Sequence, residues 1–204
     1  MKSFDERAKD WDSDPAKVER AVVVANAMRV AVPLRKEMRA LEYGCGTGLL
    51  SFALQQEFSS ITLADTSPGM LAVLAEKIKN SAVDNMQPLL VNENFQPVPE
   101  TRFDLIYSLL TLHHIPETQA ALRHFAMLLN PGGFLCIADL EKEDGSFHGP
   151  TVTDVHKGFE REALQRQVEH AGLAGVRFSS AFSVIKQVDG RAKAFPVFLM
   201  IAQK

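Results

Sequence analysis

Three glycines at alternate positions, Gly44, Gly46 and Gly48, form the part of this chain whose residue types are best suited to binding a ligand. Glycine lacks a Cβ, so the backbone can approach a ligand closely, and a helix that begins here would present unpaired N–H groups. The G-x-G-x-G spacing is not the dinucleotide fingerprint, because position 49 is leucine, and the Gly-Lys-Ser/Thr of a P-loop is absent. Both phosphate-binding interpretations are weakened. We therefore expect the glycine run to bind a ligand of another kind, and we favour this interpretation over a tight strand-to-helix turn without a ligand.

An acidic residue, Asp65, lies 21 residues after Gly44 at the end of an apolar run. In a strand-helix-strand unit a carboxylate at this place can accept hydrogen bonds from both hydroxyls of a ribose, because its two oxygens lie side by side. Taken alone, such an aspartate is more often a helix cap or a turn former. Together with the glycine run, it predicts a nucleoside ligand.

Several polar residues follow the later strands and are candidates for moving a proton. His113 and His114 come after the fourth apolar run, and a pair of this kind is also typical of a helix start or a packing site. Asp139 faces the predicted pocket or else begins a solvated charge run. We expect His148 and His156 to be exposed to solvent in a loop that could also cover a substrate. Of these, His113 is our catalytic candidate.

The two cysteines carry no chemistry in this interpretation. Cys45 lies within the glycine run, where only its backbone need matter, and Cys136 falls in an apolar run typical of a core. There is neither an H-E-x-x-H motif nor a cluster of Cys and His close in sequence, so we expect no metal site. The cysteine usage fits a reducing, cytoplasmic compartment.

Short apolar runs and helical periodicities alternate along the chain, which predicts an α/β fold with a mainly parallel sheet, helices on both faces and ligands at the carboxyl ends of the strands. Strands are expected over 40–43, 61–65, 88–91, 103–107, 134–138, 176–182 and 195–202, and helices over 4–11, 15–36, 48–57, 68–78, 116–129 and 161–171. In the second helix, Val18, Val22, Ala25 and Arg29 fall on one side.

Length and charge restrict the class of protein. The chain has 204 residues, of which 46% are hydrophobic, and this suits one globular domain. A net charge of −3 disfavours nucleic-acid and anionic-membrane partners. The stretch 21–34 is interrupted by polar residues and is shorter than the roughly 18 apolar residues of a membrane span. The first residues do not resemble a signal peptide. We therefore expect a cytoplasmic protein; the sequence does not determine its oligomeric state, whether monomer or weak dimer.

Four motifs in a fixed order resemble a known family. They are LEYGCGTG at 41–48, LADTSPGML at 63–71, FDLIYS at 103–108 and LNPGGFL at 129–135. Their order resembles that of the class I methyltransferases that use S-adenosylmethionine, over roughly residues 38–140. The resemblance implies a Rossmann-like doubly wound sheet of seven strands, mostly parallel, with the last strand antiparallel beside the fifth. It also implies a single domain, 1–204, with a helical cap (1–36), a cofactor-binding core (37–140) and a substrate loop with the C-terminal part of the sheet (141–204).

The resemblance further implies which residues bind the cofactor. Glu42 and the backbone of Gly44, Cys45, Gly46 and Gly48 would hold its methionine part, with the backbone of Ser108 and Leu109; Asp65 would hold the ribose, and Thr66, Met70 and Glu93 would lie at the adenine. Asn92 stands where the family usually has aspartate, so we expect altered affinity, because its amide oxygen can still accept from the adenine amino group.

The implied reaction is in-line transfer of a methyl group to a small-molecule acceptor, which leaves S-adenosylhomocysteine as the product. Because the cofactor carries the activation, the protein can act mainly by orienting the nucleophile and excluding water. One alternative is a non-catalytic S-adenosylmethionine-binding or regulatory protein on the same fold, suggested by Asn92 and by the lack of a dedicated catalytic motif. An NAD-dependent oxidoreductase is disfavoured by Leu49.

Overall fold

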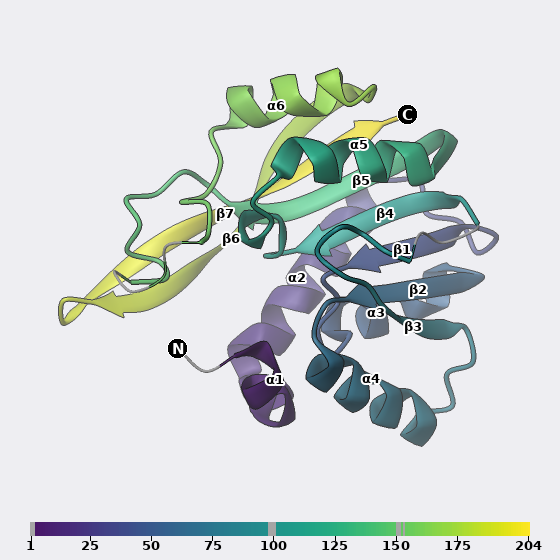
Figure 1. Ribbon diagram of the computed structural model, residues 1–204, viewed down its shortest axis with the longest axis horizontal. Coiled ribbons are helices and arrows are strands. Elements are labelled where there is room, and N and C mark those ends of the chain that lie inside the picture. The colour runs from purple at the N-terminus through teal and green to yellow at the C-terminus, as the bar shows by residue number, and fades with distance from the viewer. Residues whose placement is uncertain (1–2, 98–100, 150–151, 153) are drawn as a thin grey trace.

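A single seven-stranded sheet organises the chain in the computed structural model, which describes residues 3–97, 101–149, 152 and 154–204 (Figure 1). The strand order is β3-β2-β1-β4-β5-β7-β6. The strands are β1 (Arg39–Tyr43), β2 (Ser60–Asp65), β3 (Met86–Leu90), β4 (Phe103–Leu109), β5 (Leu129–Leu140), β6 (Ala174–Val188) and β7 (Arg191–Gln203). The α-helices are α1 (Phe4–Arg7), α2 (Pro15–Ala31), α3 (Leu49–Leu54), α4 (Pro68–Asn80), α5 (Thr118–Leu128) and α6 (Arg161–His170), with 3-10 turns η1 (Ala8–Ser13), η2 (Gln55–Glu57) and η3 (Leu112–His114).

The first five strands run parallel, and β7 runs antiparallel to both of its neighbours, β5 and β6. β7 lies beside β5 in a register that runs from Phe134 opposite Gln203 to Leu140 opposite Val197. β6 then pairs with β7 at the edge of the sheet. The predicted fold class, including the antiparallel last strand beside the fifth, is confirmed.

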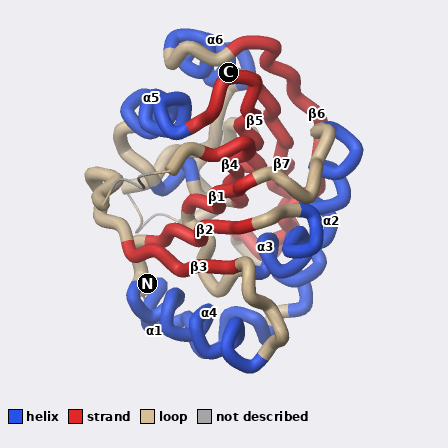
Figure 2. The backbone as a smooth tube through the Cα atoms, turned by 90° about the vertical axis from the view of Figure 1, so that its right-hand side faces the viewer, coloured by secondary structure: helices blue, strands red, loops and turns tan. Residues whose placement is uncertain are grey.

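Helices cover both faces of the sheet and create two cores. Residues from α2, α3 and α4 pack on one face, and residues from α5 and α6 pack on the other; Figure 2 shows α2 and α3 opposite α5. Successive residues of β1 alternate between these cores, with Ala40 in the first and Leu41 in the second. A strand buried on both faces is mostly apolar, which explains the unbroken apolar run 134–138 of β5, whose residues also alternate between the two cores.

The buried face of α2 is not the side that carries Val18 and Val22. Val18 and Val22 are exposed (39% and 46%), while Ala21, Val24, Ala25 and Met28 are buried. Apolar residues occupy nearly every side of this helix, so periodicity could not select a face, and packing against the rest of the fold decided it.

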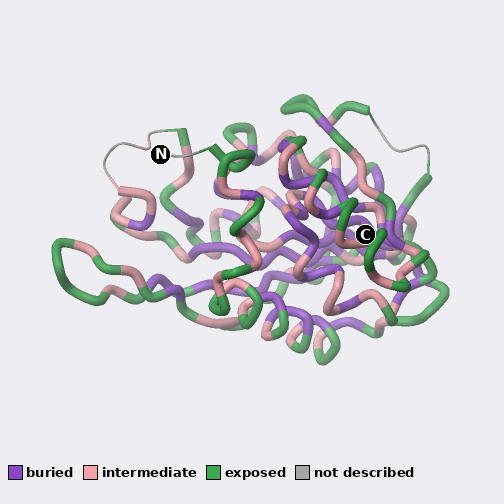
Figure 3. The backbone as a smooth tube through the Cα atoms, turned by 90° about the horizontal axis from the view of Figure 1, so that it is seen from below, coloured by how far each residue is buried: buried purple, intermediate pink, exposed green. Residues whose placement is uncertain are grey.

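The last two strands are longer than predicted. Residues 183–188 and 191–194 extend β6 and β7 into a hairpin whose turn residues, Asp189 and Gly190, both have positive φ (49° and 75°). That geometry is typical of a two-residue turn that matches strand twist. The tip of the hairpin projects from the sheet and is exposed, in contrast to the buried central strands (Figure 3). Within the described part of the chain, none of the helices has the length and apolar character that crossing a membrane requires.

Candidate functional site

The glycine run lies where the strand order reverses, at the carboxyl end of β1 and next to that of β4. In open α/β sheets this switch point leaves a crevice for ligands. Gly44, Gly46 and Gly48 all have positive φ (70°, 53° and 81°), which side chains disfavour. A Cβ on Gly44 would lie 2.1 Å from Thr111 Cγ2, whereas one on Gly46 would have only Met70 Sδ nearby, at 3.9 Å. Packing therefore requires Gly44, and the space beside Gly46 is open.

Asp65 holds the glycine run in place. Its Oδ2 accepts a hydrogen bond from the N–H of Gly46 (2.7 Å), and its Oδ1 accepts one from the N–H of Ser67 (2.8 Å). Burial raises the pKa of this carboxyl above its ordinary value, against the effect of those backbone donors. One side chain at the end of β2 thus fixes the loop after β1 to the start of α4. This organising role was not predicted from the sequence, which indicated only a ribose contact.

Glu42 on β1 is buried beneath the run, with 2% of its surface exposed. Its Oε2 accepts hydrogen bonds from the hydroxyl of Ser51 and from the backbone N–H of Ser51 (3.2 Å). The hydroxyl of Ser51 also lies 2.7 Å from that of Tyr107. Burial raises the pKa of Glu42 to about 8. The sequence contained no signal that Ser51 and Tyr107 would join this network, because they lie in α3 and β4.

The pKa of Glu42 predicts that its ionisation destabilises the fold. Between the ordinary value of 4.5 and about 8, the unfolded chain releases this proton while the folded protein keeps it, so stability falls as the pH rises. Relative to the Glu42→Gln variant, we expect the wild-type free energy of unfolding to decrease by up to about 1.4 kcal/mol per pH unit. Urea denaturation at several pH values between 5 and 8 measures this.

The exposed Glu19 on α2 supplies the matched control. The Glu19→Gln variant should follow the wild-type curve at every pH. If the wild-type and Glu42→Gln curves run parallel instead, Glu42 does not carry the raised pKa.

An open cavity of about 610 Å³ lies at the carboxyl ends of β2 and β3. It is lined by Thr66, Pro68, Leu90, Val91, Asn92, Glu93, Asn94 and Gln96. Three of these residues, Thr66, Asn92 and Glu93, were named from the sequence as an adenine site, and the structure brings them together. Met70, named with them, is buried and lies near Gly46 instead of lining the cavity.

The amide oxygen of Asn92 is already engaged. It accepts hydrogen bonds from the N–H groups of Asn94 (2.9 Å) and Gln96 (3.0 Å), and a carbonyl oxygen has two lone pairs. An adenine amino group could use this oxygen only if one of these bonds opened. The structure thus gives Asn92 a role in shaping the loop after β3, which the sequence did not predict.

The N-terminal segment is tied to both sides of the crevice. Asp5 Oδ1 accepts from the hydroxyl of Ser67 (2.5 Å) and from the N–H of Gly69 (2.8 Å) at the start of α4. Asp12 accepts from the hydroxyl of Thr47 (2.5 Å) and from Lys77 Nζ (2.6 Å). The helical cap expected from the sequence therefore lies against the glycine run. No sequence pattern indicated that two of its aspartates, Asp5 and Asp12, would anchor it.

At the end of β4, Ser108 is buried and Leu109 is half-buried. The hydroxyl of Ser108 has no hydrogen-bond partner among the described residues. Both cysteines are buried, as expected for Cys136 in the core. Burial raises the pKa of the thiols of Cys45 and Cys136, that of Cys136 to about 12.

His113 and Asp139 form a buried pair across the ends of β4 and β5. His113 Nδ1 lies 2.6 Å from Asp139 Oδ1, and the backbone N–H of His113 donates to Asp139 Oδ2 (3.2 Å). Only 1% of His113 and none of Asp139 is exposed. The interpretation of Asp139 as part of a solvated charge run is therefore wrong. Because the carboxylate accepts from Nδ1, the lone pair of His113 is on Nε2, which has no partner among the described residues.

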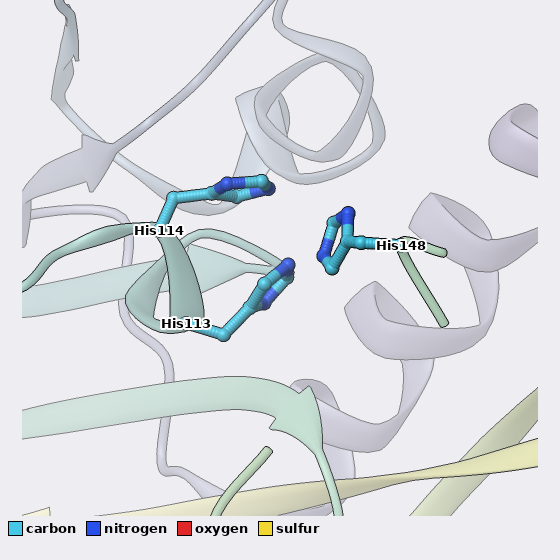
Figure 4. Close-up of side chains that lie close together, drawn as sticks. All are labelled: His113, His114 and His148. Carbon is cyan, nitrogen blue, oxygen red and sulfur yellow. The ribbon is translucent and has the colours of Figure 1, made fainter. Parts of the chain in front are cut away.

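The loop after β5 brings the ring of His148 beside those of His113 and the adjacent His114 (Figure 4). The expectation that His148 and His156 are solvent-exposed is wrong, because both are half-buried. His156 fastens the loop: its N–H donates to the carbonyl of His113 (2.8 Å), and its Nε2 lies 3.1 Å from Thr118 Oγ1. Burial and the neighbouring imidazoles lower the pKa of His114 to about 3 and that of His148 to about 4.

Comparison with known proteins gives a family and a set of relatives. A family model described as a methyltransferase domain matches residues 17–177. A ubiquinone biosynthesis O-methyltransferase of Xanthomonas campestris is 31% identical over 142 residues, which are 67% of this chain and 58% of that protein. The protein of the same name from Coxiella burnetii is 29% identical over 151 residues, covering 70% and 62%. The chain thus spans about 60% of the length of these relatives.

Solved structures share the fold. A SAM-dependent methyltransferase from Aquifex aeolicus has 23% identity and a TM-score of 0.67, and the match covers 98% of this chain and 99% of that one. Phosphoethanolamine N-methyltransferase 2 of Haemonchus contortus, in complex with S-adenosyl-L-methionine, has 14% identity and a TM-score of 0.71, covering 100% and 60%. At these identities the likeness concerns the fold.

Proposed function

This chain belongs to the class I S-adenosylmethionine-dependent methyltransferases, and from that membership we propose that it transfers a methyl group from S-adenosylmethionine to a hydroxyl oxygen of a small molecule. One observation carries the proposal. Asp65 lies between two features at the carboxyl ends of β1 to β3: it holds the glycine run through the N–H of Gly46, beside which there is open space, and it directly precedes Thr66, the first residue lining the cavity. The O-methyltransferase names of the relatives support a hydroxyl acceptor.

The residues of the crevice suit the cofactor. The open space beside Gly46, the unpartnered hydroxyl of Ser108 and the carboxyl of Glu42 offer contacts for an amino-acid group. The cavity after β2 has room for a nucleoside base. We propose that Glu42 and the backbone of Gly44, Cys45, Gly46, Gly48, Ser108 and Leu109 hold the methionine part, Asp65 the ribose, and Thr66, Met70, Asn92 and Glu93 the adenine side. When bound, S-adenosylmethionine supplies a methyl group on a positively charged sulfur that leaves as a neutral thioether.

His113 is the proposed catalytic residue, because a hydroxyl must lose its proton when its oxygen is methylated. Nε2 of His113 carries the free lone pair that can take this proton. Asp139 holds the ring in that tautomer and stabilises the imidazolium that forms. Two phenylalanine rings pack against His113 and the adjacent His114 and help to exclude water. The ring centroids of Phe4 and His114 are 5.3 Å apart, and those of Phe147 and His113 are 6.1 Å apart.

Calorimetric titration of the chain with S-adenosylmethionine, S-adenosylhomocysteine and NAD tests the cofactor assignment. We expect micromolar binding of the first two ligands and none of NAD. Binding of NAD alone, or of none of the three, would overturn the proposal. A panel of small phenols and alcohols, with S-adenosylhomocysteine formation as the readout, then tests transfer. Tight binding without transfer to any of them would favour the non-catalytic alternative.

A further inference from the structure

Three histidine rings from two separate parts of the chain converge at the edge of the crevice. His113 and His114 come from η3, after β4, and His148 comes from the loop between β5 and α6 (Figure 4). The ring centroids are 4.2 Å apart for His113 and His114, and 5.1 Å for each of these with His148. One ring nitrogen of each histidine lies within 4.8 Å of the other two.

Two of the nitrogens have no partner. Within the described residues, Nε2 of His113 and Nε2 of His148 are buried and make no hydrogen bond. A buried polar atom is costly to leave unpaired, so two of them in one cluster indicate a missing ligand. Because His113 is 1% exposed, its nitrogen is shielded from bulk solvent.

Asp139 binds the other ring nitrogen of His113, Nδ1. Its carboxylate accepts from Nδ1 of His113, which leaves the lone pair of Nε2 directed away from Asp139. Histidines that bind metals nearly always donate their second ring N–H to a carboxylate or carbonyl in this way, which fixes the tautomer and strengthens the ligand. The backbone N–H groups of His113 and Leu140 also donate to Asp139 (3.2 and 2.7 Å), so the carboxylate itself is held in place.

We propose that His113, His114 and His148 bind one divalent transition-metal ion of the Zn²⁺ class. Three neutral imidazoles are the preferred ligands of Zn²⁺, Co²⁺, Ni²⁺ and Cu²⁺, whereas Mg²⁺ and Ca²⁺ need oxygen ligands. In a tetrahedral site with Zn–N bonds near 2.05 Å, the nitrogens lie about 3.4 Å apart. The three ligand nitrogens lie within 4.8 Å of one another, so each pair would have to approach by at most about 1.4 Å when an ion binds. The fourth position would stay open for water or another small ligand.

The sequence contained no usable signal for this site. His148 lies 34 residues after His114, and the loop that carries it is positioned by His156, which bonds the carbonyl of His113. The site shares Nε2 of His113 with the proposed function, so a bound ion and the proton-accepting role of that atom exclude each other. Metal binding is measured without cofactor or acceptor, and its failure is therefore distinguishable from failure of the proposed methyl transfer.

The test is a titration of the chelator-stripped full chain with Co²⁺, followed by visible absorption. We expect one ion per chain, with the intense bands of tetrahedral Co²⁺, and displacement by Zn²⁺. The His148→Ala and His114→Ala variants should each lower the Co²⁺ affinity by about 100-fold or more, and Asp139→Asn, which removes only the supporting carboxylate, by about 10- to 100-fold.

The exposed His170 at the end of α6 gives the matched control, and His170→Ala should bind Co²⁺ as the wild type does. Thermal unfolding without metal establishes that each variant is folded. Weak octahedral bands in the wild type would overturn the proposal whatever the variants do. Wild-type affinity in His148→Ala, or an equal loss in His170→Ala, would also overturn it.

Discussion

Replacement of Asp65 by alanine is expected to weaken S-adenosylmethionine binding by about 10²- to 10⁴-fold, because two hydrogen bonds of a charged carboxylate contribute roughly 1.5–3 kcal/mol each. In the proposed complex these bonds go to the ribose hydroxyls. The same carboxylate also holds the N–H groups of Gly46 and Ser67, so its loss also loosens the glycine run that binds the methionine part. Both effects act in the same direction, and calorimetry measures their sum.

Two further variants separate these contributions. Asp65→Asn keeps one acceptor oxygen, so it should bind more tightly than Asp65→Ala and less tightly than the wild type. Asp84→Ala removes an exposed carboxylate before β3 and should bind the cofactor normally. Urea denaturation checks that all three remain folded. Affinity of folded Asp65→Ala within threefold of the wild type would exclude Asp65 from the cofactor site.

Replacement of His113 by asparagine is expected to lower kcat by about 10²- to 10⁴-fold, the usual contribution of a positioned proton acceptor. The asparagine amide can take the place of Nδ1 and donate to Asp139, so the buried carboxylate keeps a partner. The group that is lost is the nitrogen proposed to take the proton, Nε2. Measurement of kcat at saturating cofactor, with an acceptor from the phenol panel, tests this role.

Cofactor affinity serves as the internal reference, because the proposal gives His113 no part in holding S-adenosylmethionine. Calorimetry should therefore give the wild-type affinity for His113→Asn. The His170→Asn variant, with its exposed position at the end of α6, should retain full kcat. A kcat of His113→Asn within twofold of the wild type would show that the acceptor loses its proton elsewhere.

The order of strands and helices could be predicted from the sequence because its signals are local. The apolar run 134–138 of β5 is continuous, since this strand is buried on both faces, and the apolar residues of the helices α4 and α5 recur at three and four residues. The glycine run needs positive φ at Gly44, Gly46 and Gly48, and only glycine adopts this freely. Such requirements depend on residues within a few positions, and the family motifs could therefore be recognised.

Where local signals were ambiguous, the sequence did not determine the structure. Apolar residues on every side of α2 left its buried face undetermined. Residues 186–191 of the β6–β7 hairpin look like a turn, yet only Asp189 and Gly190 turn, because the two strands satisfy each other's backbone groups as far as Val188 and Arg191.

The chemistry of the site depended on contacts between distant segments, and only the tertiary structure decided it. Asp139 becomes the buried partner of His113 because β4 and β5 end side by side. His148 joins His113 and His114 because the loop after β5 folds back and is fastened at His156. No periodicity encodes the path of a loop, since its course is set by the sum of many weak contacts across the whole fold. The sequence by itself therefore determined the family, the sheet and the position of the crevice, and the folded chain determined which polar atoms face one another within it.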